Sequence, residues 1–443
     1  MAPDTDELKR QVCAAADARR ADIVRVGTAI WKRPEVGFKE HATAALVADE
    51  LRKLGLAPRE ALGITGVKAV TTFNSGGPTL AILGELDALP VRDHPDSDPT
   101  TGAVHACGHN TQIAHMLGVA MVLKDIGAAS LLSGRVAFIA VPAEEYVELE
   151  WRREQMDAGR IEFLGGKPEL IKLGEFDDVD MAMMVHSSVY SQNRKLAVAE
   201  SSNGMLAKRI NFRGRAAHAG TSPHRAINAL NAATLALSAI HFQRETFQEE
   251  DTIRIHPIIT KGGEGVNIVP ADVRVETFVR GSTLDAIRDA EMKVDRCCRA
   301  GAMAIGATVE IDTLAGYLPL IQNDSMRQLF KRNAISLVGE DGYTEPPPTK
   351  ASTDAGDLSH VIPVLHPSAG GFAGTAHGPD FQIVDDDLAY LNPVKAMAMT
   401  LIDLLADNAR AGQDVVANTR TRMTKDEYLT FMRDLARVEV YPS

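Results

Sequence analysis

The sequence has little of what marks several large classes of protein. Its four cysteines, at positions 13, 107, 297 and 298, are too few and too scattered for a disulfide framework. Acidic residues outnumber basic ones, with 59 Asp and Glu against 47 Lys and Arg. No dense run of basic residues is present that could neutralise phosphate groups, so we expect no nucleic-acid partner. There is also no apolar run of about 18 residues and no charged leader before an apolar stretch. We therefore expect a soluble, cytoplasmic protein without membrane contact.

What is present is typical of a globular chain, with 45% hydrophobic and 24% charged residues. Residues 6–56 have a helical pattern. Short apolar runs without alternation follow at 79–83, 135–141 and 181–185, separated by helical stretches such as 113–126. Unalternating runs between helices indicate strands that are buried on both faces. The sequence therefore predicts an α/β layer with a mainly parallel sheet.

Residues 196–314 have a different pattern, in which strands and helices follow the order β-α-β-β-α-β. This order is that of the ferredoxin-like fold. We predict a metal-binding catalytic domain formed by 1–195 and 315–443, and an inserted ferredoxin-like α+β domain at 196–314. A single continuous α/β domain is the alternative.

Polar side chains follow three of the predicted buried strands. Glu85 and Asp87 come after the first, Glu144 and Glu145 after the second, and His186 after the third. Ligands of open parallel sheets sit beyond the carboxyl ends of the strands, so we expect these side chains to converge. Adjacent glutamates usually belong to a solvated face. At the end of a buried strand, however, a carboxylate is costly unless it is paired or bound to metal.

Cys107 and His109 lie two residues apart, just before a predicted helix, and Gly108 between them permits a tight turn. A lone histidine is more often a hydrogen-bonded or surface residue than a ligand. Here, thiolate, imidazole and carboxylate groups together suit a divalent transition ion. One glutamate of the pair can hold the metal while its neighbour takes a proton from water.

Eight motifs in this chain resemble, in order, those of the aminoacylase and hippurate-hydrolase type amidohydrolases, family twenty of the metallopeptidases. They are RPEVGF at 33–38, ELDALP at 85–90, HACGHN at 105–110, PAEE at 142–145, GRAAHA at 214–219, GGEGVNIVP at 262–270, STDAGD at 352–357 and TAH at 375–377.

The resemblance implies a role for each matching residue. The metal ligands that it implies are Cys107, His109, Glu145, His186 and His377. Glu144 would be the general acid/base, with Asp87 in a supporting position. One or two ions are implied, and the donor atoms suit zinc, manganese or cobalt. The inserted domain would be a lid and dimerisation domain, so we expect a homodimer or a higher homo-oligomer. Within it, His218 would stabilise the oxyanion and Asn267 would contact a substrate carboxylate.

Two departures from the common family pattern are Asn110, where many relatives have Asp, and Glu85, where they often have Asp or His. Asn110 and the STDAGD motif point to the branch of aminobenzoyl-glutamate hydrolases and related dipeptidases. A polar run at 146–173, which contains Trp151, Arg152 and Arg153, is a further oddity. It either lines the pocket for an anionic or aromatic substrate or is a surface decoration.

We therefore predict a metal-dependent hydrolase that cleaves a C–N bond of a small, carboxylate-bearing substrate. The expected bond is the amide of an N-acyl or aminobenzoyl amino acid or of a dipeptide. The first alternative is an aryl-amine aminohydrolase of the nitroanthranilate type, which uses the same ions and base to release ammonia from an electron-poor ring. The second is a binding protein that keeps the fold without turnover.

Overall fold

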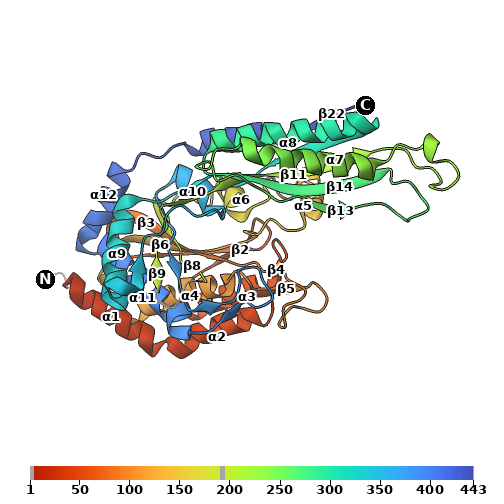
Figure 1. Ribbon diagram of the computed structural model, residues 1–443. Helices are drawn as coiled ribbons and strands as arrows, with labels where there is room; N and C mark the ends of the chain where they lie inside the picture. Colours follow the sequence, from red (N-terminus) through yellow and green to blue (C-terminus); the bar gives the residue numbers. More distant parts are fainter. Residues whose placement is uncertain (1–3, 190–194, 443) are drawn as a thin grey trace. The chain divides into compact units, whose positions relative to one another are not determined.

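The chain divides into two compact units in the computed structural model, which describes residues 4–189 and 195–442 (Figure 1). The first unit comprises residues 1–200, 321–347 and 357–425. The second comprises residues 201–320, 348–356 and 426–443.

The first unit is built on a six-stranded sheet with the strand order β1-β2-β6-β3-β7-β18. The strands from β6 to β18 are parallel, whereas β1 and β2 pair antiparallel at one side. The predicted mainly parallel sheet is therefore confirmed. Its strands are β1 (Arg59–Leu62), β2 (Gly66–Thr72), β3 (Asn74–Glu85), β6 (Ser133–Val141), β7 (Met181–Met183) and β18 (Val364–Leu365).

Nine helices of the described residues belong to this unit. The helical pattern at 6–56 is divided among the first three, and Gly55, with a left-handed φ of +84°, follows the third. The helices are α1 (Thr5–Ala18), α2 (Arg20–Trp31), α3 (His41–Lys53), α4 (His109–Asp125), α5 (Leu149–Asp157), α6 (Gly166–Leu173), α9 (Asp324–Val338), α11 (Asn392–Leu405) and α12 (Arg410–Asn418). A further helix, α10 (Ala355–Val361), lies where the chain leaves the second unit.

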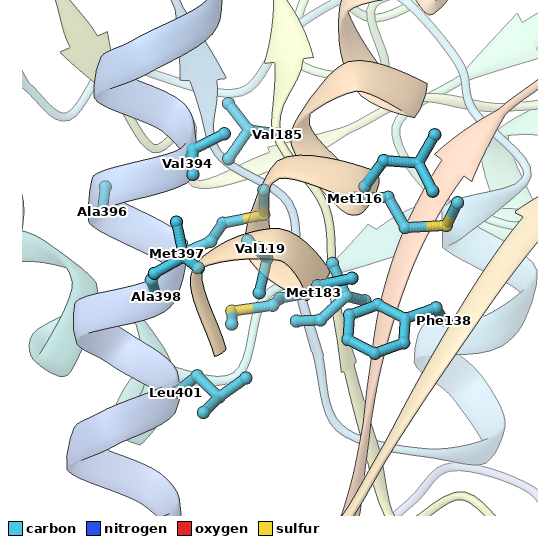
Figure 2. Close-up of a cluster of buried hydrophobic side chains, with 14 of the residues drawn as sticks. Met116, Val119, Phe138, Met183, Val185, Val394, Ala396, Met397, Ala398 and Leu401 are labelled. Atoms are coloured by element: carbon cyan, nitrogen blue, oxygen red, sulfur yellow. The ribbon is translucent and has the colours of Figure 1, made fainter. Parts of the chain in front are cut away.

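The core of the first unit lies between the sheet and the helices α4 and α11. Nearly every residue of α4 is buried, which is why its sequence shows no polar face. Figure 2 shows Val119 of α4 and Leu401 of α11 in one apolar cluster with Phe138 of β6 and Met183 of β7. The close packing of these side chains fixes α4, and therefore its first residues, against the sheet.

The segment Asp387–Leu405 is, by length and composition, apolar enough to cross a membrane, in contrast to the prediction that no such segment exists. Of its most apolar window, 78% is buried inside the structure. The segment includes α11, whose apolar residues pack in the core just described. It therefore has the burial of a core helix, which explains its composition.

The first unit also contains short strands that lie outside the six-stranded sheet and form three smaller sheets. A four-stranded sheet has the order β17-β9-β19-β8, and two further pairs are β4 with β5 and β20 with β21. These strands are β4 (Leu89–Pro90), β5 (Ala103–Val104), β8 (His186–Ser187), β9 (Leu196–Ala197), β17 (Tyr343–Thr344), β19 (Ser368–Ala369), β20 (Phe372–Ala373) and β21 (Gln382–Ile383).

The second unit is an antiparallel sheet with two long helices. Its strands run in the order β12-β14-β11-β15-β22, and β13 also pairs with β14. The chain order is β11-α7-β12-β13-β14-α8-β15, in which β12 and β13 both pair with β14 and take the place of one strand of the predicted β-α-β-β-α-β pattern; the separate ferredoxin-like unit is therefore confirmed. Its elements are β11 (Gly204–Arg213), α7 (Ala229–Phe242), β12 (Arg254–Ile255), β13 (Ile258–Lys261), β14 (Asp272–Gly281), α8 (Leu284–Ile305), β15 (Thr308–Ala315), α13 (Lys425–Leu435) and β22 (Arg437–Tyr441). Two short strands, β10 (Ser201–Ser202) and β16 (Leu320–Ile321), pair where the chain enters and leaves this unit.

The end of the chain differs from the predicted domain boundaries, which assigned all of 315–443 to the catalytic domain. Strand β22 instead pairs antiparallel with β15 in the second unit. Arg437 at its start forms ion pairs with Glu291 and Asp295 of α8. The sequence of β22 does not indicate which sheet the strand joins, because β22 and β15 lie more than a hundred residues apart in the chain.

Candidate metal centre

Three strand ends share one edge of the main sheet. β3 ends at Glu85, which is in register with Val141 at the end of β6. β7 runs beside β3 in the same direction, and the chain after it continues to His186 in β8. Because these strands are parallel, the polar residues that follow them lie at the same edge, as the sequence predicted.

Cys107 and His109 flank a left-handed turn at the start of α4. Gly108 has a φ of +79°, and a Cβ there would lie 2.6 Å from Cβ of Ser187. Both the backbone conformation and the lack of space therefore require glycine. The turn places His109 at the first position of α4, where its ring lies 5.7 Å from that of His186.

The five side chains predicted as ligands form two overlapping groups. Cys107, His109 and His186 make up the first, and Cys107, Glu145 and His377 make up the second. Within each group, one potential ligand atom of every residue lies within 4.8 Å of the others. Cys107 belongs to both groups, which is the arrangement required of a thiolate that two ions share.

The donor atoms lie close enough to one another to bind a common ion, and Sγ of Cys107 lies 3.5 Å from Nε2 of His186. Nε2 of His109 lies 3.1 Å from Oε2 of Glu85, and Nε2 of His377 lies 3.0 Å from Oε1 of Glu145. Among the described residues, however, neither His109 Nε2 nor Glu145 Oε1 has a hydrogen-bond partner. Ligands at about 2.0–2.3 Å from one ion lie roughly 3–4 Å from each other. The donor set, in which Cys107 and His109 are buried and His377 is exposed at one side, therefore fits one or two divalent transition ions.

Glu144 lies beside these groups. With Glu85 and His109 it forms a third cluster of potential ligand atoms, and its Oε2 lies 4.0 Å from His109 Nε2. Its side chain is buried, with 5% of the residue exposed. A carboxylate next to the ligands but outside the two overlapping groups is placed to exchange protons with water.

Asp87 connects the ligands to the strand ends. The Nδ1 atom of His109 lies 2.9 Å from the carbonyl oxygen of Asp87 and 3.2 Å from its Oδ1. The other oxygen, Oδ2, accepts a hydrogen bond from the backbone N–H of Glu145 at 2.8 Å. Such a contact fixes the ring orientation of a histidine ligand and leaves Nε2 for the metal.

A model of peptidase family M20/M25/M40 matches residues 81–401, a range that includes every side chain of this cluster. The chain belongs to peptidase family M20/M25/M40. As a member of this M20 family it is a metallohydrolase that acts on C–N bonds, which confirms the predicted metallopeptidase family; the aminobenzoyl-glutamate hydrolase branch stays a prediction.

Relatives within the M20 family extend the comparison over most of the chain. The chain is 28% identical to the Xaa-Arg dipeptidase of Mus musculus over 430 residues, which cover 91% of this chain and 90% of that protein. It is also 28% identical to a p-aminobenzoyl-glutamate hydrolase of Escherichia coli (strain K12) over 334 residues, or 71% of this chain and 62% of that protein. A dinuclear metal-binding M20 peptidase from Bacillus subtilis has the same fold, with a TM-score of 0.64 at 20% identity, over 88% of this chain and 99% of that one.

Charges within the M20 centre already favour a cation. Burial and the Glu145 carboxylate raise the pKa of the Cys107 thiol, but the imidazoles of His186 and His109 outweigh both and lower it to about 6. The Glu145 carboxylate raises the pKa of His377 to about 11. The thiol therefore ionises readily, and the acidic groups hold positive charge on the rings. The thiolate of Cys107 and the carboxylate of Glu145 that favour positive charge here also favour a bound divalent ion.

His218 and Asn267 belong to the second unit of this M20 protein. Both are exposed. They lie in segments that contact each other, since His218 forms a bridge with Ile268 and the N–H of Ala219 donates to the carbonyl of Asn267 at 2.9 Å. The structure thus brings these two residues near one another within their unit. Their roles towards the substrate stay predictions.

The structure buries two cations near the metal centre: Lys167, which the sequence did not single out, and Arg152, which it named only as part of the polar run. Both lie in the run at 146–173, which folds into α5 and α6, and both are 0% exposed. Lys167 Nζ lies 2.5 Å from Oε1 of Glu85. A surface decoration would not bury two cations, so that interpretation of the run is wrong. Nothing in a polar sequence distinguishes a buried lysine from a solvated one.

The double role of Cys107 gives a first prediction. Cys107→Ala removes a ligand from both overlapping groups. Loss of a residue that only contacts a ligand lowers metal affinity by up to about 100-fold, so we expect the loss of this ligand to lower it by more than about 100-fold. Metal content after dialysis measures this, with Cys13→Ala in α1 as the matched control. Full metal content in Cys107→Ala would contradict the shared position.

Glu40 gives a prediction of pH dependence. This buried carboxylate accepts hydrogen bonds from the N–H of Ala143 at 2.8 Å and from the hydroxyl of Thr65 at 2.6 Å. Burial and the charge of Asp87 raise the pKa of Glu40 from 4.5 to about 7. The folded state therefore binds this proton more tightly than the unfolded state does. The stabilisation is complete below about pH 4.5 and is lost as the pH rises to about 7.

Glutamine at position 40 carries no charge; its amide oxygen can accept the N–H of Ala143, and its NH2 group can donate to the Thr65 hydroxyl, which then acts as the acceptor. We expect Glu40→Gln to be more stable than the wild type at pH 8, by up to ~3 kcal/mol, and the difference to vanish near pH 4.5. Denaturant unfolding of both proteins across this pH range measures it, with Glu60→Gln on the exposed strand β1 as the control. A difference that does not change with pH would show that Glu40 is not protonated on folding.

Proposed function

We propose that this protein hydrolyses the amide bond of a dipeptide, or of an N-acyl or aminobenzoyl amino acid, whose free carboxylate remains on the amino-acid part. The observation that carries the proposal is the position of Glu144 beside the two ligand groups that share Cys107. The similarity to an Xaa-Arg dipeptidase and to an aminobenzoyl-glutamate hydrolase supports the choice of an amide over other C–N bonds.

The chain's own residues would divide the chemistry as follows. A divalent ion, when bound by Cys107, His109 and His186 or by Cys107, Glu145 and His377, supplies a Lewis acid and makes water more acidic. Glu144 takes the proton of the attacking water and delivers it to the nitrogen of the departing amine. Buried surroundings keep the Glu144 carboxylate from being solvated by bulk water.

The donor set bears on the identity of the ion. A thiolate ligand favours zinc, whereas imidazole and carboxylate ligands also suit manganese and cobalt. We propose one of these three metals, in one or two copies. Titration of the metal-free protein with each ion, followed by metal analysis, distinguishes among them.

The second unit is proposed to act as lid and as the surface of a homodimer or higher homo-oligomer, with His218 stabilising the oxyanion and Asn267 contacting the substrate carboxylate. Strand β13 supports the oligomer because its apolar residues Ile258 and Ile259 are 60% and 42% exposed. An exposed apolar edge strand is a site of association. Light scattering of the wild type and of Ile258→Lys tests this part.

The test of the function is a comparison of substrates. An Xaa-Arg dipeptide, aminobenzoyl-glutamate and a nitroanthranilate are offered to the protein loaded with each of the three metals. We expect cleavage of the first or second, and a large loss of turnover when its free carboxylate is amidated. Ammonia release from the nitroanthranilate without amide cleavage would establish the aryl-amine aminohydrolase instead, and an absence of any amide cleavage would overturn the proposal.

A further inference from the structure

The backbone is strained immediately before the two glutamates. Strand β6 ends at Val141, and Ala143 then adopts a φ of +53°, a left-handed conformation that is unfavourable for a residue with a Cβ. Such a conformation persists only where its surroundings determine it. The turn at 142–145 carries both Glu144 and Glu145, so the groups that hold it also hold these side chains.

Holding this turn in place requires contacts from several directions. The N–H of Ala143 donates to Glu40, its carbonyl accepts from the N–H of Gly166 at 3.3 Å, and the N–H of Glu145 donates to Asp87 at 2.8 Å. The carbonyl of Glu145 accepts the N–H of Val147 within the same stretch of chain at 2.9 Å, and its second acceptor position faces α5. Arg152 of α5 fills this position.

The guanidinium of Arg152 bridges two carbonyl oxygens. Its Nη2 donates to the carbonyl of Glu145 at 2.5 Å, and its Nη1 donates to the carbonyl of Leu164 at 2.6 Å. A Cβ on Gly37 would lie 2.3 Å from Nη2, so a glycine is needed for the guanidinium to reach this place. The contact therefore joins the turn to the segment between α5 and α6.

This cation is buried without a carboxylate. Arg152 is 0% exposed, forms no salt bridge within 4–189 and 195–442, and its Nε has no hydrogen-bond partner there. The rings of Phe38 and Tyr146 lie 5.3 and 5.8 Å from its Cζ and give partial compensation. Burying a charge without a carboxylate partner is unfavourable. One of the two carbonyl oxygens that the guanidinium contacts belongs to the metal-binding turn, which points to a role in the site.

We propose that Arg152 is a positioning residue of the metal centre: by fixing the main chain of Glu145, it holds the Glu145 carboxylate towards Cys107 and His377 and Glu144 towards His109. The catalytic part of this inference rests on the proposed function, whereas the metal-binding part does not. Lysine cannot replace Arg152, because only the planar fork of a guanidinium reaches two carbonyl oxygens at once.

The experiment is a double-variant cycle read by Co²⁺ affinity. Arg152→Lys is expected to weaken the ion that Glu145 binds by about 10–100-fold, as the loss of an outer contact does. In a Glu145→Gln background the same change is expected to alter the affinity by less than about 2-fold, because an effect that acts through Glu145 is already lost. The proposal is overturned if Arg152→Lys weakens Co²⁺ binding by the same factor in the wild type and in Glu145→Gln, or if Arg152→Lys alone leaves Co²⁺ affinity unchanged.

Two further variants keep the result interpretable. Arg153→Lys is the matched control, since Arg153 is the next residue of α5 and its side chain is 30% exposed beside Asp157; Co²⁺ affinity should stay unchanged. If Arg152→Lys fails to fold, Phe38→Leu is used instead, because it removes one ring that supports the guanidinium. Phe38→Leu should weaken the binding of Co²⁺ in the wild type and should have no such effect in Glu145→Gln. Unchanged affinity in Phe38→Leu would then overturn the proposal.

Turnover separates this inference from the proposed function. On a cleaved amide, Arg152→Lys is expected to lower kcat about 10–100-fold with KM nearly unchanged, because Glu144 is misplaced while substrate contacts remain. If the wild type cleaves no amide, the proposed function fails, and the Co²⁺ cycle still decides the role of Arg152. If the wild type is active and the cycle is additive, only the Arg152 inference fails.

Discussion

Glu144→Gln is expected to lower kcat by about 10²–10⁴-fold, the range that a general acid/base contributes, while the protein keeps its metal. Glutamine fills the same buried space, but its amide cannot accept a proton from water. Glu144 lies 4.0 Å from His109 Nε2 and outside the two groups that share Cys107, so its replacement leaves those ligands in place. Steady-state kinetics on the substrate found by the screen, with metal analysis of the same sample, measures both quantities.

Glu148→Gln is the control for this variant. Glu148 is exposed and forms an ion pair with Lys39 at 2.7 Å, so we expect activity close to that of the wild type. Loss of metal from Glu144→Gln would make Glu144 a ligand. Retention of more than about a tenth of the wild-type kcat would take the general acid/base role away from it.

Lys167→Met is expected to destabilise the protein by about 3–5 kcal/mol, the cost of removing one partner of a buried ion pair. Lys167 and Glu85 are both 0% exposed, and their Nζ and Oε1 atoms lie 2.5 Å apart. Without the lysine, the charge of Glu85 stays buried next to His109. The midpoint of denaturant unfolding, measured on the metal-loaded protein, gives the size of the effect.

Lys172→Met is the matched control because Lys172 lies in the same helix, α6, and pairs with Glu169 at 2.9 Å, with the Lys172 side chain 29% exposed and that of Glu169 1% exposed. Glu169 keeps two backbone N–H donors, from Glu162 and Phe163, so this variant should lose less stability than Lys167→Met. Adding Glu85→Gln to Lys167→Met should recover part of the stability, since it removes the uncompensated charge. Equal effects of Lys167→Met and Lys172→Met would refute a special role of the buried pair.

The centre of the first unit could be predicted because its signals are local. Unalternating apolar runs mark strands that are buried on both faces, and residues after parallel strands meet at one edge. Glu85, Glu145 and His186 followed from this rule. Gly108 between Cys107 and His109 indicated the tight turn, which the structure shows as a left-handed glycine. His377 came only from the family motif, because neither strand order nor spacing predicts its place.

Other features depend on contacts that no local pattern records. Strand β22 pairs with β15, although its alternating sequence would fit any sheet with one exposed face. Lys167 and Arg152 lie in a run of charged residues whose composition predicts exposure. Their burial is decided by partners distant in the sequence, the carboxylate of Glu85 and the rings of Phe38 and Tyr146.

The amino-acid sequence by itself determined the class of fold, the β-α-β-β-α-β order within 196–314, and the types of residue available to bind metal. Periodicity and the residues at strand ends determine these features, and both act over a few positions. Tertiary structure alone decided that β22 pairs at the edge of the second sheet and that Lys167 and Arg152 are buried near the glutamates. Each of these features is a contact between groups that lie far apart in the chain. The free energy of burying such groups depends on the packing of the whole core and not on neighbouring residues in the sequence.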